Sequence, residues 1–478
     1  MQEHKEISEL TTLFDTVVKG GYCIGCGACA SLEKSPVKVQ FDDHKKLQAR
    51  VVGDITDDSI APYLSVCPFS GESLNEDEIG KDLFSAHAQK DDKLGYFINN
   101  YAGYVAEDSF RDRGSSGGMG TWILAELIKR KLVDYVIHIH QHTPDETNPS
   151  LFAYTISSTY EEIISGAKSR YYPIEMTEIL ASVKNNGGNY VIVGIPCFIK
   201  TIRLLSYQDA VLKERIKFCI GLVCGHLKSA SFADMFSWQT GINPKQMTAI
   251  DFRTKLEGQG ANRYGVTVSG KIDDEEVIRV SKPVNQLYGT NWGLGFFKYK
   301  ACDFCDDVVA ENADLTVGDA WLPKYVNETK GTNIIIVRNP ILDRILQEAS
   351  IEGRLNLDNL DKSDIVKSQS SGFNHRREGL SYRLYLTDKE GDWRPKKRVE
   401  AKGNGWKKRF KDIQKTRIRL AQESHIAFKK ALNQDSFAVF EKEMSPLVTK
   451  YHKLYQTPLW RRVMRKGKKI VKKLLGKK

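Results

Sequence analysis

Residues 21–30, GYCIGCGACA, hold three cysteines with two residues between each: Cys23, Cys26 and Cys29. A cubane iron–sulfur cluster is bound by four thiolates, and such short gaps allow one tight loop to present three of them. Gly25 and Gly27 support this interpretation, because glycine adopts positive φ angles and lets backbone N–H groups approach the sulfur atoms. The stretch therefore predicts a 4Fe-4S cluster.

A fourth ligand is needed for this cluster. Two-cluster ferredoxins place another cysteine three residues after the third, where it binds the other cluster, but that position is Glu33 here. Cys67, followed by Pro68, can close a single cluster instead. A zinc site is the alternative, since paired cysteines also bind zinc. We call Cys23, Cys26, Cys29 and Cys67 the first cysteine group, and we expect a ferredoxin-type domain over residues 1–90.

A second cysteine pair occurs in KACDFCDD, residues 300–307. A lone C-x2-C fits zinc, redox or cluster roles, so two more ligands are needed to choose among them. Cys197 and Cys224 each end an apolar run, where a strand delivers side chains to a site, whereas Cys219 precedes its run. The predicted second cysteine group is Cys197, Cys224, Cys302 and Cys305. The alternative is that Cys197 and Cys224 are free and buried, with zinc or nothing at the pair.

The fold class follows from the middle of the chain. Apolar runs at 135–140, 190–196, 220–225 and 332–338 resemble strands, and residues 121–130 resemble a helix. Such alternation predicts an α/β domain over residues 95–345 with a mixed or parallel sheet. Polar, helix-like sequence follows and predicts a helical extension over 346–478.

Composition and charge indicate a folded protein and argue against some kinds of partner. The 478 residues are 41% apolar and 27% charged, which is typical of a folded soluble chain. The N-terminus lacks the apolar stretch of a secretory signal, so we expect a cytoplasmic location, where reduced cysteines serve as ligands. The net charge is +11, but residues 456–478 alone contain ten Lys or Arg and no acid. A general nucleic-acid-binding surface is therefore not implied.

The basic end of the chain forms a separate feature. In residues 458–478, apolar side chains recur near helical spacing and Lys or Arg fill the other face. This pattern predicts peripheral contact with the inner face of a membrane. A tail without a partner and a nucleic-acid contact are the alternatives.

Several segments offer groups for a phosphate or a planar ring. The loop in RDRGSSGGMGTWILAELIKR, 111–130, exposes backbone N–H groups at the start of a helix, where a pyrophosphate binds well. AKSRYYP, 167–173, adds Lys168 and Arg170 for anions and Tyr171 for a ring. DFRTK, 251–255, adds Arg253 and Lys255, and VGDAW, 317–321, adds Asp319. Each alone also fits ordinary surface charge or packing.

In order, the motifs C-x2-C-G-x-C, Cys-Pro, SSGG, GIPC, VCG, DFRTK, C-x2-C and ADLTVGDAW resemble the coenzyme F420 hydrogenase/dehydrogenase beta-subunit family over residues 18–340. The resemblance implies a ferredoxin-type domain, a flavin-binding α/β domain, FAD and one or two 4Fe-4S clusters. On this basis the FAD would be lined by Ser115, Ser116, Gly117, Gly118 and Thr121, with Ser169, Arg170 and Tyr171 nearby. Arg253 and Asp319, from the segments above, complete the expected cofactor-binding residues.

The function expected from this resemblance is electron transfer from ferredoxin or a reduced deazaflavin, through the clusters, to FAD and on to an unidentified substrate. Similar plastid enzymes reduce chlorophyll-type rings, and bacterial members with basic tails are associated with surface-polysaccharide synthesis. Lys255 or Tyr171 is the expected proton donor. The alternatives are a non-catalytic electron-transfer subunit of a larger complex and a zinc-stabilised binding module.

Overall fold

The computed structural model describes residues 8–53, 61–145 and 148–456. Its N-terminal part contains short elements around the first cysteine group. These are α1 (Glu9–Leu13), a π-helical turn (Phe14–Val18), β1 (Val37–Phe41), β2 (Leu47–Val51), α2 (Tyr63–Val66) and α3 (Glu76–Phe84). β1 and β2 form an antiparallel hairpin in which Val37 pairs with Val51.

The centre of the protein is an eight-stranded sheet in the order β15-β5-β14-β13-β9-β8-β6-β7. The strands are β5 (Asn99–Val105), β6 (Tyr135–Gln141), β7 (Phe152–Ser157), β8 (Tyr190–Gly194), β9 (Ile216–Leu222), β13 (Leu315–Asp319), β14 (Asn333–Val337) and β15 (Leu355–Asn359). β13, β9, β8 and β6 pair in parallel, and the other pairs are antiparallel. The sheet is therefore mixed.

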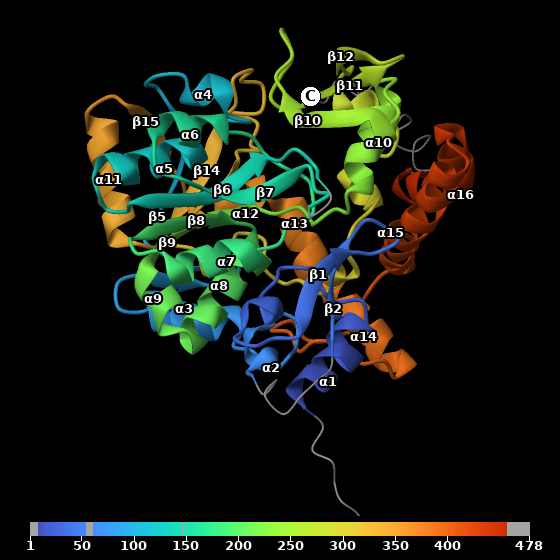
Figure 1. The fold of residues 1–478 in the computed structure, drawn as a ribbon, viewed down its shortest axis with the longest axis horizontal. Helices are drawn as coiled ribbons and strands as arrows, with labels where there is room; N and C mark the ends of the chain where they lie inside the picture. The colour runs from blue at the N-terminus through green and yellow to red at the C-terminus, as the bar shows by residue number, and fades with distance from the viewer. Residues whose placement is uncertain (1–7, 54–60, 146–147, 457–478) are drawn as a thin grey trace, which may run out of the picture.

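Helices cover both faces of this sheet (Figure 1). One face carries α5 (Met119–Lys129), α6 (Tyr160–Ser165) and α11 (Pro340–Ile351), and the other carries α7 (Thr177–Asn185), α8 (Pro196–Gln208) and α9 (Ala210–Arg215). Side chains of a strand alternate between faces, so Phe218 and Ile220 of β9 join the first layer while Cys219 joins the second. The near-continuous apolar strands arise because both faces are buried.

Two smaller parts flank the sheet. A three-stranded antiparallel sheet contains β10 (Met247–Thr254), β11 (Gly265–Ile272) and β12 (Glu275–Val280), next to α10 (Ser231–Gln239). The C-terminal helices are α12 (Lys362–Ser368), α13 (Ser370–Asn374), α14 (Leu380–Glu390), α15 (Lys408–Asn433) and α16 (Phe437–Tyr455), with a π-helical turn at His375–Gly379. α15 and α16 pack together through Phe428 and Phe440, whose ring centroids are 5.1 Å apart.

The predicted fold class is confirmed, and the predicted strands and helix correspond to β6, β8, β9, β14 and α5. The prediction that Cys219 precedes its strand is wrong. β9 begins at Ile216, because the residues before Cys219 continue the apolar alternation into the core. β15 lies beyond position 345, where we placed the end of the α/β domain. The domain boundaries themselves stay predictions.

Among the residues that the structure describes, no helix combines the length and the apolar character needed to cross a bilayer. The proposed membrane-binding segment, 458–478, lies outside the described residues.

An ion pair between partly buried Arg354 and the buried carboxylate of Glu126 links the start of edge strand β15 to α5. Arg354, which precedes β15, donates to both carboxylate oxygens of Glu126 at 2.9 and 3.0 Å. Arg130 donates to the same carboxylate at 2.7 Å. Burial by itself raises the pKa of Glu126, but the bonds from Arg354 and Arg130 outweigh it and the pKa falls below its ordinary value.

We therefore expect Glu126→Gln to lower the free energy of unfolding by about 2 kcal/mol at pH 7, because charge-assisted hydrogen bonds are lost. A carboxylate with a lowered folded-state pKa stabilises above its unfolded pKa and loses that effect as the pH falls through its folded pKa. The difference from wild type should thus shrink below about pH 4 in urea unfolding.

The matched control is Glu352→Gln. Glu352 also accepts from Arg354, at 2.7 Å, but its side chain is 55% exposed. An exposed pair contributes less than about 1 kcal/mol. Equal losses in the two variants would contradict the buried role assigned to Glu126.

Candidate functional site

The first cysteine group lies on a loop that glycine makes possible. Gly25 and Gly27 have φ angles of +66° and +88°, and a Cβ at Gly25 would collide with the Leu47 carbonyl. Cys23 Sγ accepts hydrogen bonds from the backbone N–H groups of Gly25 and Ala49, both at 3.4 Å. Backbone N–H groups that face a cysteine sulfur are one of the features that tune iron–sulfur centres.

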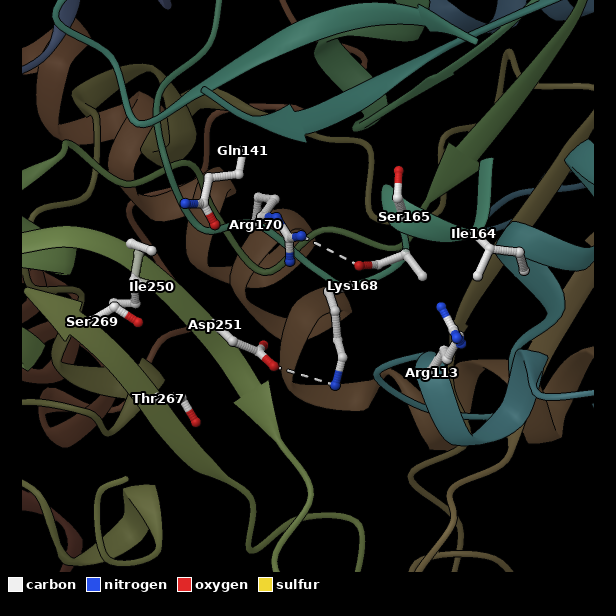
Figure 2. Close-up of a pocket in the computed structure, with 12 residues that line it drawn as sticks. Arg113, Gln141, Ile164, Ser165, Lys168, Arg170, Ile250, Asp251, Thr267 and Ser269 are labelled. Carbon is white, nitrogen blue, oxygen red and sulfur yellow. Dashed lines mark hydrogen bonds and ion pairs between the residues drawn. The ribbon is translucent and has the colours of Figure 1, made fainter. Parts of the chain in front are cut away.

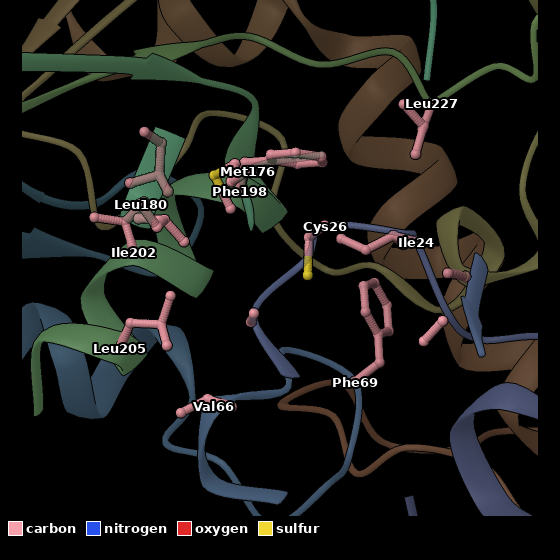
Figure 3. Packing of buried hydrophobic residues seen from close by; sticks show 14 of the residues in the cluster. Ile24, Cys26, Val66, Phe69, Met176, Leu180, Phe198, Ile202, Leu205 and Leu227 are labelled. Atoms are coloured by element: carbon pink, nitrogen blue, oxygen red, sulfur yellow. The ribbon is translucent and has the colours of Figure 1, made fainter. Parts of the chain in front are cut away.

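The four thiols of this group lie close enough to interact electrostatically. Burial raises the pKa of Cys29, and Cys23, Cys26 and Cys67 raise it further. Cys26 is buried among apolar side chains from separate segments, including Phe69, Met176 and Phe198 (Figure 3). The fold therefore brings Cys67 to the loop that carries the other three cysteines.

The second cysteine group forms where the sheet meets the C-x2-C turn. Cys197 lies in the first turn of α8, and Cys224 follows β9. Cys302 lies within a 3-10 turn (Lys300–Phe304), and Cys305 directly follows that turn. Burial raises the pKa of Cys197, and the nearby Cys224, Cys305 and Cys302 raise it further. The fold thus brings the four predicted residues together.

Cys219 is separate from this group. Its sulfur is fully buried, and the charged groups that act on it are Arg203 and Asp314 rather than other thiols. The two cysteine groups, in contrast, lie close to each other, since Cys26 of the first also acts on the pKa of Cys197 in the second.

In both cysteine groups a backbone N–H group donates to a cysteine sulfur, which suits an iron–sulfur cluster. Leu227 N–H donates to Cys302 Sγ at 3.2 Å, as Gly25 and Ala49 donate to Cys23. Within the described residues, no three His, Cys, Asp or Glu side chains are arranged to hold one metal ion. Cluster thiolates bind different iron atoms and so need not converge on one point. Burial raises the pKa of Cys26 and Cys302 to about 11, so metal binding would release protons.

The residues expected at a flavin form a connected network. Ser169 N–H donates to Ser115 Oγ at 2.8 Å, and Arg253 Nη2 donates to the Ser115 carbonyl at 3.2 Å. Arg253 also pairs with Asp319 at 3.0 Å and donates to Tyr171 Oη at 3.4 Å. Burial by itself lowers the pKa of Arg253, but Asp319 more than offsets this, so the buried guanidinium stays charged.

At the centre of the glycine loop, Ser116 and Gly117 contact the strands of the large sheet and not the flavin network. Ser116 Oγ donates to the Thr332 carbonyl at 3.1 Å, away from Ser169, and a Cβ at Gly117 would crowd Asn333. Gly118 takes a φ of +86° as the N-cap of α5, whose first turn contains Thr121. Ser116 and Gly117 therefore hold the loop against β5 and β14, and Ser115 is the loop residue bonded to Ser169 and Arg253.

A cavity of about 340 Å³ opens beside this network (Figure 2). Lys168 crosses it to pair with Asp251 at 3.3 Å, and its φ of +115° is rare for a side-chain-bearing residue. Arg170 donates to the Ala167 carbonyl at 3.3 Å, while its Nε and Nη1 are buried and have no hydrogen-bond partner in the part of the chain that the structure describes. Donors of this kind fit an anionic ligand.

Lys255 lies near this cavity rather than among the thiols. Its Nζ donates to the Arg111 carbonyl. Burial, and then the charge of Lys168, lower its pKa to about 8. An ammonium group with that pKa can give up a proton near neutral pH.

Sequence reasoning missed two sets of residues. His138 and His140 project from one side of β6, with their Nε2 atoms 2.8 Å apart, and burial lowers the pKa of His138 to about 3. Their alternate spacing in YVIHIHQ was the available signal. The second set is the buried cations Lys228, Lys298 and Arg376 near the second cysteine group. No motif marked these.

Comparison with known proteins gives related matches. Residues 100–181 match the N-terminal family model of the coenzyme F420 hydrogenase/dehydrogenase beta subunit, and residues 187–363 match the corresponding C-terminal family model. The second cysteine group lies inside these ranges, and the first lies before them. The coenzyme F420-dependent sulfite reductase of Methanocaldococcus jannaschii is 21% identical over 417 residues, which cover 82% of this chain. The chain spans 58% of that relative's length.

A solved chain of the F420-reducing [NiFe] hydrogenase complex from Methanosarcina barkeri superposes with a TM-score of 0.46 and 14% identity, over 62% of this chain and 96% of that one. The two family models follow one another along the sequence and together match more than half of its 478 residues. The chain therefore belongs to the coenzyme F420 hydrogenase/dehydrogenase beta-subunit family.

Proposed function

We propose that this chain is an iron–sulfur flavoprotein oxidoreductase that takes electrons from ferredoxin or a reduced deazaflavin and delivers them to a substrate through FAD. The oxidoreductase and electron-transfer role comes with the family. The observation that supports the clusters and the flavin is the packing of residues from both cysteine groups, Cys26 and Cys197 among them, around one buried cluster of side chains.

A separate set of residues would bind each cofactor. The first and second cysteine groups would each bind one 4Fe-4S cluster, and the network around Ser115, Arg253 and Asp319 would bind FAD beside the cationic cavity. Bound there, clusters exchange single electrons and a flavin exchanges electron pairs with substrate. Arg170 and Lys168 would neutralise the phosphates of FAD.

Aromatic residues fill the space between the second cysteine group and the flavin network. Trp292 contacts His226, two residues after Cys224, with ring centroids 4.6 Å apart. Trp292 also contacts Tyr171, with ring centroids 5.1 Å apart. This packing would exclude water between the two regions and fix the position of Tyr171.

Lys255 and Tyr171 remain the proposed proton donors. Lys255 has a pKa of about 8, so it would be charged and able to donate below that pH. Tyr171 Oη accepts a hydrogen bond from Arg253 Nη1 at 3.4 Å, which would hold the phenol group in position.

The substrate is proposed only by class. The related sulfite reductase points to F420-linked reduction, and the basic tail to a surface-polysaccharide pathway at a membrane. The alternative is an electron-transfer subunit that docks on a larger enzyme, as the hydrogenase relative is part of a complex. Flavin content separates these possibilities, because an adaptor would contain clusters without FAD.

The decisive experiment is iron, sulfide and flavin analysis of the full-length protein purified without oxygen. We expect about eight iron and eight sulfide with one FAD, since each 4Fe-4S cluster contains four of each. Cys302→Ala should lose about half of the iron and keep the FAD.

Cys219→Ala is the matched control, because Cys219 is equally buried but lies apart from both groups. It should keep all of the iron. Equal iron contents in Cys302→Ala and wild type would contradict the assignment of a second cluster to these cysteines. Zinc without iron would contradict the proposed redox function.

A second test concerns FAD itself. Arg170→Gln removes a guanidinium whose Nε and Nη1 are buried and make no hydrogen bond with any described residue. Loss of a charge-assisted hydrogen bond of about 1.5–3 kcal/mol should weaken FAD binding by roughly tenfold or more. Titration of flavin-free protein, followed by quenching of flavin fluorescence, measures the affinity.

Arg279→Gln serves as its control. Arg279 is exposed on β12 of the small sheet that borders the cavity through β10 and β11. It should bind FAD as wild type does. An unchanged affinity in Arg170→Gln would move the flavin phosphates away from this cavity.

A further inference from the structure

Arg376 is a buried cation next to the second cysteine group. It belongs to the π-helical turn His375–Gly379, and only 1% of its surface is exposed. Its Nη2 donates to the carbonyl of Gly225, the residue after Cys224, at 2.8 Å. This bond places the guanidinium beside the loop that carries one of the predicted ligands.

The same guanidinium lies close enough to three of the four thiols to interact with them electrostatically. Burial by itself lowers the pKa of Arg376, but Cys305, Cys224 and Cys302 more than offset this and raise it. Its Nε and Nη1 are buried and have no hydrogen-bond partner among the described residues. They are therefore available to the sulfur atoms of this group.

No carboxylate of the described residues forms an ion pair with Arg376. No salt bridge between described residues includes Arg376, whereas nearby Lys298 pairs with Asp303 at 2.5 Å. Arg383 also pairs with the Asp303 carboxylate, with its Nε 3.6 Å from Oδ1. The one carboxylate inside the C-x2-C turn is thus occupied by other cations.

The first cysteine group has a different electrostatic surrounding. Lys46 acts on Cys23 but pairs with Asp42 at 3.3 Å, and Asp42 acts on the same thiol with the opposite sign. Lys200 acts on Cys67 but pairs with the buried carboxylate of Glu76 at 3.2 Å. The cations near this group are therefore largely neutralised.

We propose that Arg376 raises the reduction potential of the cluster bound by the second cysteine group and makes it the more oxidising of the two. Reduction adds a negative charge, and a buried, unneutralised cation stabilises that charge. The inference rests on the proposed function, since it needs both clusters. Arg376 lies beyond residue 363, where the family match ends, so the C-terminal segment sets a property of the region that the family models match.

The test is a redox titration, followed by electron paramagnetic resonance, of full-length protein purified without oxygen, with dithionite as reductant. In Arg376→Gln, the ratio of reduced to oxidised second cluster at a fixed potential should fall at least tenfold. For a one-electron couple this is a shift of about 59 mV to more negative potential. Arg376→Lys keeps the charge and should recover most of the wild-type value.

Arg377→Gln is the matched control. Arg377 adjoins Arg376, but unlike Arg376 it pairs with a carboxylate, that of Glu311, at 3.2 Å. Its removal should leave the potential of the second cluster unchanged. An unchanged potential in Arg376→Gln, or an equal shift in Arg377→Gln, would overturn the proposal.

A comparison that leaves Arg376 intact decides the matter if Arg376→Gln loses its cluster. Cys302→Ser and Cys29→Ser would each retain one cluster, the first-group and second-group cluster respectively. The second-group cluster should have the more positive midpoint potential, and an equal or more negative value would overturn the inference. Iron-free wild-type protein would instead contradict the proposed function itself.

Discussion

The buried carboxylate of Asp303 joins distant parts of the chain at the turn between Cys302 and Cys305. Lys298 Nζ lies 2.5 Å from its Oδ1, and His375 Nε2 lies 3.5 Å from the same oxygen. Arg383, from α14, donates to the Asp303 carbonyl at 2.8 Å. Burial by itself raises the pKa of Asp303, but Lys298 and Arg383 outweigh it and lower the pKa. The geometry of two predicted ligands therefore depends on the C-terminal helices.

A second buried charge network extends this dependence to the N-terminal part. Arg398 makes two hydrogen bonds to Glu311, at 2.6 and 2.9 Å, and its Nε lies 3.5 Å from Glu76 of α3. Glu76 in turn pairs with Lys200 of α8, one turn after Cys197. Removing one partner from such a network leaves a buried charge uncompensated, which is costly. The segment after residue 363 is thus part of the interior around both cysteine groups.

This arrangement gives the two cysteine groups unequal surroundings within one fold. Near the first group, cations and carboxylates cancel one another, and Cys23 also receives backbone N–H bonds. Near the second, Arg376 retains its charge, and Trp292 packs between His226 and Tyr171. Both cysteine groups lie on the sheet face covered by α7 and α8, while the cationic cavity lies between the α6 end of the sheet and the small sheet.

Much of this organisation was accessible from the sequence where it depends on neighbouring residues. The spacing of Cys23, Cys26 and Cys29 with two glycines requires a tight loop, and apolar runs specify strands because both sheet faces are buried. Cys219 shows the limit of such reasoning. Its apolar run suggested a later start, but pairing with β8 extends β9 back to Ile216.

By itself, then, the sequence determined the cysteine loop, the α/β class and the family resemblance, because short-range spacing and periodicity encode them. Only the tertiary structure decided that Cys197 lies near Cys26, that Ser115 rather than Ser116 is bonded to Ser169, and that Arg376 lies beside the second cysteine group. These relations depend on how segments that are far apart in the chain pack together. The burial that leaves a charge without a counter-ion likewise arises only when those segments meet.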